Sequence, residues 1–327
     1  MDDTRLTAKI SNESDVENFQ EELNKIYQWE TNNNMKFNSE KFELMRYGNN
    51  EELKNSTDYF TPDFTDIMER KMETRDLGIQ MNEDLSFKSH IELTRKKIKQ
   101  KIGWILRSFQ TRTPQFMKKV WKSLILPHAD YGCQVWYTPD HLGEISTLEE
   151  LQRNYTKRIT GQKQNNYWQR LENLRIYSLQ RRYERYFILY TWKILEGMVP
   201  DCGIKVLISD RRGRYCPLPP LPKTRSKLIN LKEQTFQIWG PKLFNCLPSQ
   251  LRNMTGCRID KFKACLDNFL QLIPDEPKTE TLTPRFSSLH TNRASNSLVD
   301  ATRSIQLDQT LLDKLCGLTN PLLTPGL

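Results

Sequence analysis

The sequence lacks the long apolar segments that membrane proteins require. No apolar run approaches the roughly 18 residues of a membrane span. The most apolar stretch, FILYTWKIL at residues 187–195, is short and follows basic residues, so it predicts a core helix. Residues 1–30 also lack the pattern of a secretory signal peptide. We therefore expect a protein without a membrane partner, located inside the cell in the nucleus or the cytoplasm.

The sequence also lacks cysteines in the paired spacing of disulfide frameworks. Its seven cysteines are an odd number, and no two of them form a CxxC pair. This usage argues against a disulfide scaffold and indicates a reducing compartment. Cys246, Cys257, Cys265 and His290 could form a zinc site, although we favour the interpretation that these thiols are buried or neutral.

The charges are unevenly distributed along the 327 residues. Residues 1–87 contain 10 Lys and Arg against 20 Asp and Glu, whereas residues 88–193 contain 21 against 8. Residues 194–278 contain 14 against 8, and the remainder of the chain is balanced. A basic block of this size is typical of a surface that binds a polyanion, and a solvated helical face is the alternative.

The first 85 residues predict a small region of strands and one helix. Ser14 and Glu17 form a capping-box pattern, and apolar residues at helical spacing follow as far as Asn33. Residues 49–74 are polar and acidic, which predicts a loop. Alternating apolar side chains predict strands at three places: Thr4–Ile10, Phe37–Tyr47 and residues 76–81.

From residue 86 the apolar period changes from two to 3.6, which predicts a helical region that extends to residue 200. Its first helix has an apolar face of Ile91, Ile98, Ile102, Ile105 and Phe109. Three further helices are predicted from their caps: one from Thr113–Pro114 to Pro127, one from Ser146 and Glu149 to Gly161, and one from Ser178 to Gly197.

Residues 201–278 predict a Pro-rich linker followed by a small helical region. The motif PLPPLP could bind a polyproline-recognition domain, but such matches are common and we favour a linker. Two helices are expected at Phe236–Leu251 and Phe262–Leu272. Residues 279–327 lack periodicity and predict a disordered tail.

Several sequence blocks, taken in order, resemble reverse transcriptases of LINE-type (non-LTR) retrotransposons. Asp2-Asp3 followed by TRLTAKI resembles the end of their acidic hairpin motif, and RDLGIQMNEDLSFKSHI resembles their palm-to-thumb junction. The resemblance covers roughly residues 1–278. The other blocks are NKIYQWETNNNMKFNSEKFELMRYG, KSLILPHADYGCQVW, LEELQRNYTKRITG, YWQRLENLRIYSLQRRYERY and FQIWGPKLFNCLPSQLR.

The resemblance implies an α+β fold, with a truncated palm remnant at residues 1–85 and a mainly helical, thumb-like domain at 86–200. It further implies that Asp2 and Asp3 are catalytic ligands of Mg²⁺ and that Lys41 is a proton donor to pyrophosphate. The fingers, the first strand of the hairpin and a third carboxylate have no counterpart in the chain. We therefore expect weak or no Mg²⁺ binding and no polymerase activity from this chain. The alternatives are a solvated acidic end and an exposed strand-edge lysine.

Nucleic-acid contact is the activity that we expect the chain to retain. Leu77 and Gly78 resemble the turn that approaches the primer, although a simple bend would use the same residues. The expected phosphate contacts are Arg95, Lys96, Lys97, Lys99 and Lys101, then Lys118, Lys119 and Lys122, and then Arg181, Arg182 and Arg185. Tyr183 and Tyr186 could stack on bases or belong to the core. The partners would be RNA and DNA, bound with little sequence preference.

Three functional hypotheses follow from the sequence. The first is a fragment of an RNA-directed DNA polymerase that is inactive alone and retains nucleic-acid binding. The second is an incomplete gene model of a full, active reverse transcriptase. The third is a domesticated scaffold protein that uses PLPPLP and the helical bundle.

Overall fold

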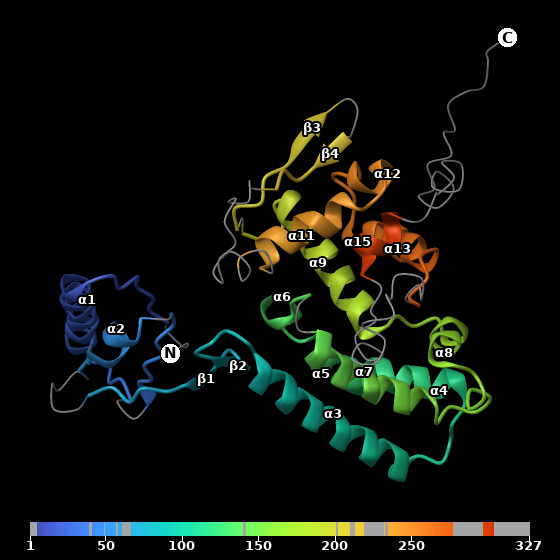
Figure 1. Ribbon diagram of the computed structural model, residues 1–327, viewed down its shortest axis with the longest axis horizontal. Helices are drawn as coiled ribbons and strands as arrows, with labels where there is room; N and C mark the ends of the chain where they lie inside the picture. Colours follow the sequence, from blue (N-terminus) through green and yellow to red (C-terminus); the bar gives the residue numbers. More distant parts are fainter. Residues whose placement is uncertain are drawn as a thin grey trace, which may run out of the picture. The chain divides into compact units, whose positions relative to one another are not determined.

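The computed structural model describes residues 5–38, 41–48, 50–56, 58–60, 67–139, 142–200, 202–209, 213–218, 232, 235–276 and 297–303. It has the expected α+β composition and is mostly helical (Figure 1). The strands of this described part form two small antiparallel sheets. The chain divides into two compact units, Met1–Leu93 and Thr94–Leu327, which we describe separately.

The first unit is built around helix α1, Glu13–Asn32. The predicted helix is confirmed, but its cap is Asn12, whose side chain accepts a hydrogen bond from the backbone of Asp15, and Ser14 lies inside the first turn. The apolar face of α1 contributes Leu23 and Tyr27 to a small core. Tyr59 and Met68 complete the buried part of this core.

A β-hairpin forms the regular sheet of the first unit. Strand β1, Glu73–Asp76, pairs antiparallel with β2, Ile79–Asn82. The turn residues Leu77 and Gly78 have φ of 46° and 85°, as in the tight turns that suit hairpins. Where we predicted a single strand at residues 76–81, the structure has a hairpin, and its turn lies within that segment.

Three other predictions for this unit are wrong. Residues 5–10 of the predicted first strand form no strand, and the described residues of the segment Phe37–Tyr47 make only an isolated bridge between Leu44 and Arg70. The physical reason is that alternation alone cannot supply the hydrogen-bonded partner that a strand needs. The predicted loop at 49–74 contains helix α2, Glu51–Ser56, and the start of β1.

The second unit is mainly helical, and helix α3, Lys88–Ser108, spans the division between the two units. The other elements are α4 Pro114–Val120, the π-helical η2 Trp121–Ile125, α5 Leu126–Asp130, α6 Cys133–Trp136, α7 Leu142–Thr156, α8 Tyr167–Leu174, α9 Leu179–Leu195, β3 Leu207–Ser209, β4 Gly213–Tyr215, α11 Phe236–Asn245, α12 Ser249–Arg252, α13 Ile259–Gln271 and α15 Leu298–Arg303.

Helix α9 is the central element of the second unit, and α11 packs along it (Figure 1). Trp192 of α9 stacks on Phe262 of α13 with ring centroids 4.6 Å apart, and its indole donates to the carbonyl of Met254. Tyr183 and Phe187 of α9 are also fully buried. Residues on both sides of the predicted boundary at 200 therefore share one core.

The helix boundaries differ from the sequence prediction at several places. Ser178 caps α9 as predicted, but Ser146 lies inside α7, where its hydroxyl donates to the carbonyl of Gly143. The helix expected to end at Pro127 continues through η2 into α5. The predicted disordered tail contains α15, whose Leu298 is buried, and the tail residues other than 297–303 lie outside the described ranges.

Candidate nucleic-acid interface

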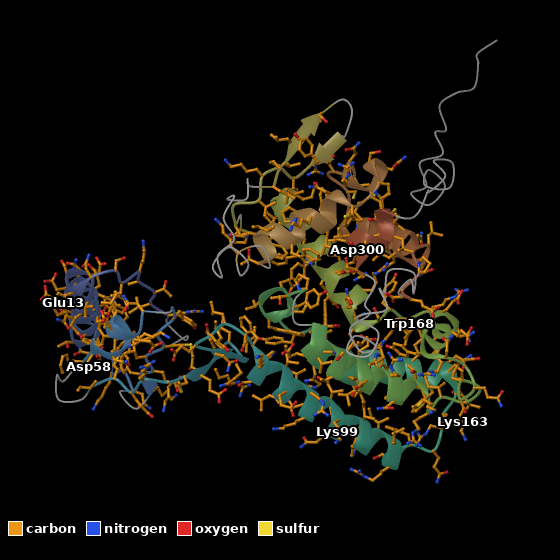
Figure 2. The ribbon with its side chains drawn as sticks, in the orientation of Figure 1. Glu13, Asp58, Lys99, Lys163, Trp168 and Asp300 are labelled. Atoms are coloured by element: carbon orange, nitrogen blue, oxygen red, sulfur yellow. The ribbon has the colours of Figure 1, made fainter. Side chains whose placement is uncertain are left out.

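Helix α3 presents an apolar face on one side and cations on the other. Ile91, Ile98 and Ile105 recur at helical spacing and are almost fully buried. The remaining surface is strongly basic, because Glu92 is the one acidic residue within the sequence of this helix. Lys96, Lys97 and Lys99 are exposed, whereas Arg95 and Lys101 are half-buried. Lys99 is labelled on α3 in Figure 2.

Helix α4 and η2 bring a second group of cations. Thr113 and Pro114 open α4 as predicted, with the proline in its first turn. Lys119 and Lys122 are exposed, and Lys118 is half-buried. Burial, followed by the positive charges of Lys122 and Arg175, lowers the pKa of Lys118. These cations are thus close enough to repel one another.

His128 shows that the cations of α3 lie next to α5. Burial lowers the pKa of this imidazole, and the charges of Lys101 and Lys97 lower it further. Asp130, at the end of α5, is occupied elsewhere in an ion pair with Arg182. The field between α3 and α5 is therefore positive and lacks a compensating carboxylate from Asp130.

We call six lysines of these elements the basic surface: Lys97, Lys99, Lys101, Lys118, Lys119 and Lys122. Within the part of the chain that the structure describes, none of the six forms an ion pair with an acidic side chain. An anion that binds beside neighbouring lysines relieves the repulsion between them, and a chain of phosphates supplies several anions at regular intervals.

The three arginines that the sequence placed at the interface are used inside the protein. Arg181 is 1% exposed and lies beside Glu184 and Asp275. Arg182 donates from Nε and Nη2 to Asp130 at 2.8 and 2.6 Å, which joins α9 to α5.

Arg185 makes a similar two-atom contact with Asp267 of α13, where its Nη2 donates at 2.7 Å. These contacts hold α9 between its neighbours, so we leave the three arginines out of the basic surface. Tyr183 is fully buried in the core, and the hydroxyl of Tyr186 donates to Asp130. Tyr183 thus belongs to the core, and the ring of Tyr186 lies under the guanidinium groups of Arg182 and Arg185, at 5.3 and 5.9 Å from its centroid.

The sequence argument missed cations that the fold brings close to α4. Arg175, at the end of α8, lies near enough to Lys118 to affect its pKa. Lys157, Arg158 and Lys163 are exposed in the connection that follows α7, and Lys163 is labelled in Figure 2. The backbone of Thr160 in this connection donates to the carbonyl of Arg112, between α3 and α4. In the sequence, the stretch RNYTKRITGQK contains several basic residues and no acidic ones, and this pattern could have indicated the additional cations.

The residues that resemble the polymerase motif are placed only in part. Asp2 and Asp3 lie outside the described residues. Arg5 donates to Asp76 at 2.7 Å, so the segment that follows them contacts the end of β1. The segment that starts at Lys41 also contacts β1, through a hydrogen bond from the Thr74 hydroxyl to Glu43. Lys41 itself is exposed.

Leu77 and Gly78 form the exposed tip of the hairpin that these segments contact. The side chain of Leu77 is 68% exposed. The positive φ of both residues explains the glycine as a requirement of the turn. Three of the segments that carry the resemblance thus meet at one hairpin.

The described residues offer no metal centre and no membrane span. No group of three or more His, Cys, Asp or Glu side chains in these ranges could hold a metal ion. Cys257 and Cys265 are free thiols, and burial raises the pKa of Cys257. The thiol of Cys246 donates to the carbonyl of Lys242, and His290 lies outside the described ranges. None of the helices described is both long enough and apolar enough to cross a bilayer.

Comparisons with known proteins assign no family to the chain. The interpretation of the basic surface therefore depends on its own charges and contacts. No family model matches the sequence, and neither the curated proteins nor the solved structures give a match.

Proposed function

We propose that this protein binds the sugar–phosphate backbone of RNA and DNA through the basic surface. The observation that carries the proposal is the group of six lysines on α3, α4 and η2, which no described acidic side chain neutralises. Phosphate contacts position a protein on nucleic acid without reading its bases, so sequence preference should be small. The lowered pKa of His128 and of Lys118 supports a surface whose positive charges are packed closely.

We also propose that the chain corresponds to the C-terminal part of a LINE-type reverse transcriptase and does not polymerise by itself. The ordered blocks of the sequence support this origin, together with the meeting of three of them at one hairpin. The alternative is an incomplete gene model. It predicts that the genomic sequence upstream of Met1 encodes, in frame, an aromatic residue followed by alanine.

The domesticated-scaffold alternative rests on the PLPPLP motif. Its residues 219–222 lie outside the described ranges, so the structure adds nothing to it. A pull-down with the PLPPLP segment replaced by a Gly-Ser linker of equal length would separate it from nucleic-acid binding. Loss of a protein partner with unchanged nucleic-acid affinity would favour the scaffold.

The test of the binding proposal removes three charges from α3. In the variant Lys97→Gln, Lys99→Gln, Lys101→Gln, the buried Ile98 and Ile105 are untouched, so folding should survive. Arg95 and Lys96 stay unchanged, because each also interacts within the protein. The slope of log affinity against log salt concentration should be shallower for the variant than for the native chain. Each phosphate contact that is lost should reduce the slope by up to about 0.9 on duplex DNA, or about 0.7 on single strands.

The matched control removes three charges from another helix of the same unit. Arg258, Lys261 and Lys263 surround Asp260 at the start of α13, and the first and last of them pair with it. Their replacement by glutamine lowers the net charge by the same amount but should leave the salt slope nearly unchanged. Absence of binding at low salt, or an equally weakened affinity in both variants, would contradict the proposal.

A further inference from the structure

An exposed tryptophan lies among the cationic residues of α3. Trp104 is 51% exposed, although tryptophan is among the largest apolar side chains. It lies three residues after Lys101 and three residues before Arg107, so both cations are its neighbours on the helix surface. A single exposed apolar side chain is common on protein surfaces, so its surroundings decide what it means.

The indole of Trp104 is held in place from one side. Its ring lies 5.9 Å from that of Phe109 at an interplanar angle of 83°, and Phe109 in turn lies 5.3 Å from Phe116 of α4. Such edge-to-face contacts restrict the rotamers of the rings. A ring that is already ordered loses less conformational entropy when a ligand stacks on it.

Arg107 is positioned along the same face. A Cβ built on Gly103 would lie 3.3 Å from Nη1 of Arg107, so the guanidinium lies back over the glycine, beside Trp104. Glycine in the middle of a helix costs about 1 kcal/mol relative to alanine. Here it leaves room for a cation next to the exposed ring.

We propose that Trp104 stacks on an unpaired base, so that the basic surface prefers single-stranded RNA or DNA to duplex. This inference rests on the proposed function and names its substrate class. Lys101 and Arg107 would hold the phosphates on either side of the stacked base. A duplex shields the faces of its bases within the stack, so it could use the lysines but not the ring.

The charges around Trp104 favour nucleic acid over a protein partner. A protein interface also uses tryptophan and arginine, but it needs an acidic or apolar partner surface of defined shape. The surface here is basic on both sides of the ring, and α3 contains no acidic residue beyond Glu92. This pattern fits a ligand with regularly spaced negative charge and flat aromatic faces.

The experiment compares Trp104→Leu with Trp104→Phe in the full chain. Leucine keeps an apolar side chain and removes the aromatic face, whereas phenylalanine keeps a smaller face. A short fluorescein-labelled oligothymidylate, an oligouridylate and a DNA duplex of the same length serve as probes at low salt. We expect Trp104→Leu to bind both single strands about tenfold more weakly, Trp104→Phe to be weakened less, and duplex binding to stay unchanged.

The control Tyr131→Leu removes an aromatic ring that is 55% exposed and lies after α5. It should bind all three probes like the native chain. If the native chain binds none of the probes, the proposed function fails and this inference fails with it. If the native chain binds and Trp104→Leu binds single strands equally well, only the stacking inference is overturned. Unchanged binding together with a loss of self-association on size-exclusion chromatography would assign Trp104 to a protein contact instead.

Discussion

Replacing Glu149 by glutamine should flatten the pH dependence of the stability of the helical unit. Glu149 is half-buried in α7, where Oε2 accepts from the backbone of Leu179 at 2.8 Å and Oε1 accepts from the hydroxyl of Tyr167. Burial, the largest cause, raises the pKa of this carboxyl to about 7, and the charge of Asp275 adds to the effect. Glutamine has the same shape and stays neutral at every pH.

The sign of the effect follows from the two pKa values of Glu149. Its pKa is about 7 in the folded chain and near the ordinary 4.5 in the unfolded chain. Between these two values the folded state binds more protons than the unfolded state, so the free energy of unfolding falls as pH rises. The stabilisation from the protonated Glu149 is therefore lost above pH 7. Lowering the pH from about 8 to about 6 should thus raise the free energy of unfolding by about 1 kcal/mol through Glu149.

The assay is thermal unfolding followed by circular dichroism at both pH values. For a chain of this size the native protein should gain about 2–4 °C in Tm at the lower pH from this residue. Glu184 is fully buried with its pKa likewise raised to about 7, and it contributes in the same direction. Because Glu184 is present in both proteins, the difference between native and Glu149→Gln isolates Glu149. An equal pH dependence in the two proteins would refute the reasoning.

Three further predictions concern a turn, a buried hydroxyl and catalysis. Leu77→Asn should stabilise the first unit by about 0.5–1 kcal/mol, because Leu77 has a positive φ that asparagine tolerates better. Slower amide hydrogen exchange in β1 and β2 would show this stabilisation, and faster exchange would argue against the turn. Tyr155→Phe should lower the free energy of unfolding by about 1–2 kcal/mol, because it removes the hydrogen bond to the carbonyl of Met117 while the ring still packs on Trp121. Denaturant unfolding measures this change, and an unchanged midpoint would mean that water replaces the hydroxyl. The purified chain should extend no primer on an RNA template with Mg²⁺ or Mn²⁺, and extension that Asp3→Asn abolishes would show that this expectation is wrong.

The sequence was informative where a segment determines its own structure. The apolar periodicity of α1 and α3 and the cap of α9 at Ser178 depend on residues within a few positions of each other, and these elements were predicted. The strands at the beginning of the chain depend on partners that the sequence cannot locate. Leu44, for example, makes its one bridge to Arg70.

The same limit applies to the candidate site. Lys97 and Lys99 are exposed because Ile98 and Ile105 fix which side of α3 is buried, and that inference is local. By contrast, the carboxylates that engage Arg182 and Arg185 lie 52 and 82 residues away in the sequence. A cation cannot be assigned to a surface until such distant acids have been located.

The π-helical turn Trp121–Ile125 makes the orientation of the basic surface sensitive to insertions and deletions. The backbone of Leu126 donates to the carbonyl of Trp121, five residues back, and the wider turn leaves space before Pro127, whose ring would clash in a regular helix. Deletion of Ser123 alone would close this wider turn to regular α-helical geometry, and the ring of Pro127 would then clash with the carbonyl four residues before it and bend the helix. Lys118, Lys119 and Lys122 would shift relative to Ala129, which is buried in α5. Drift in the length of this segment would separate the lysines of α4 from those of α3 even if every charge were retained.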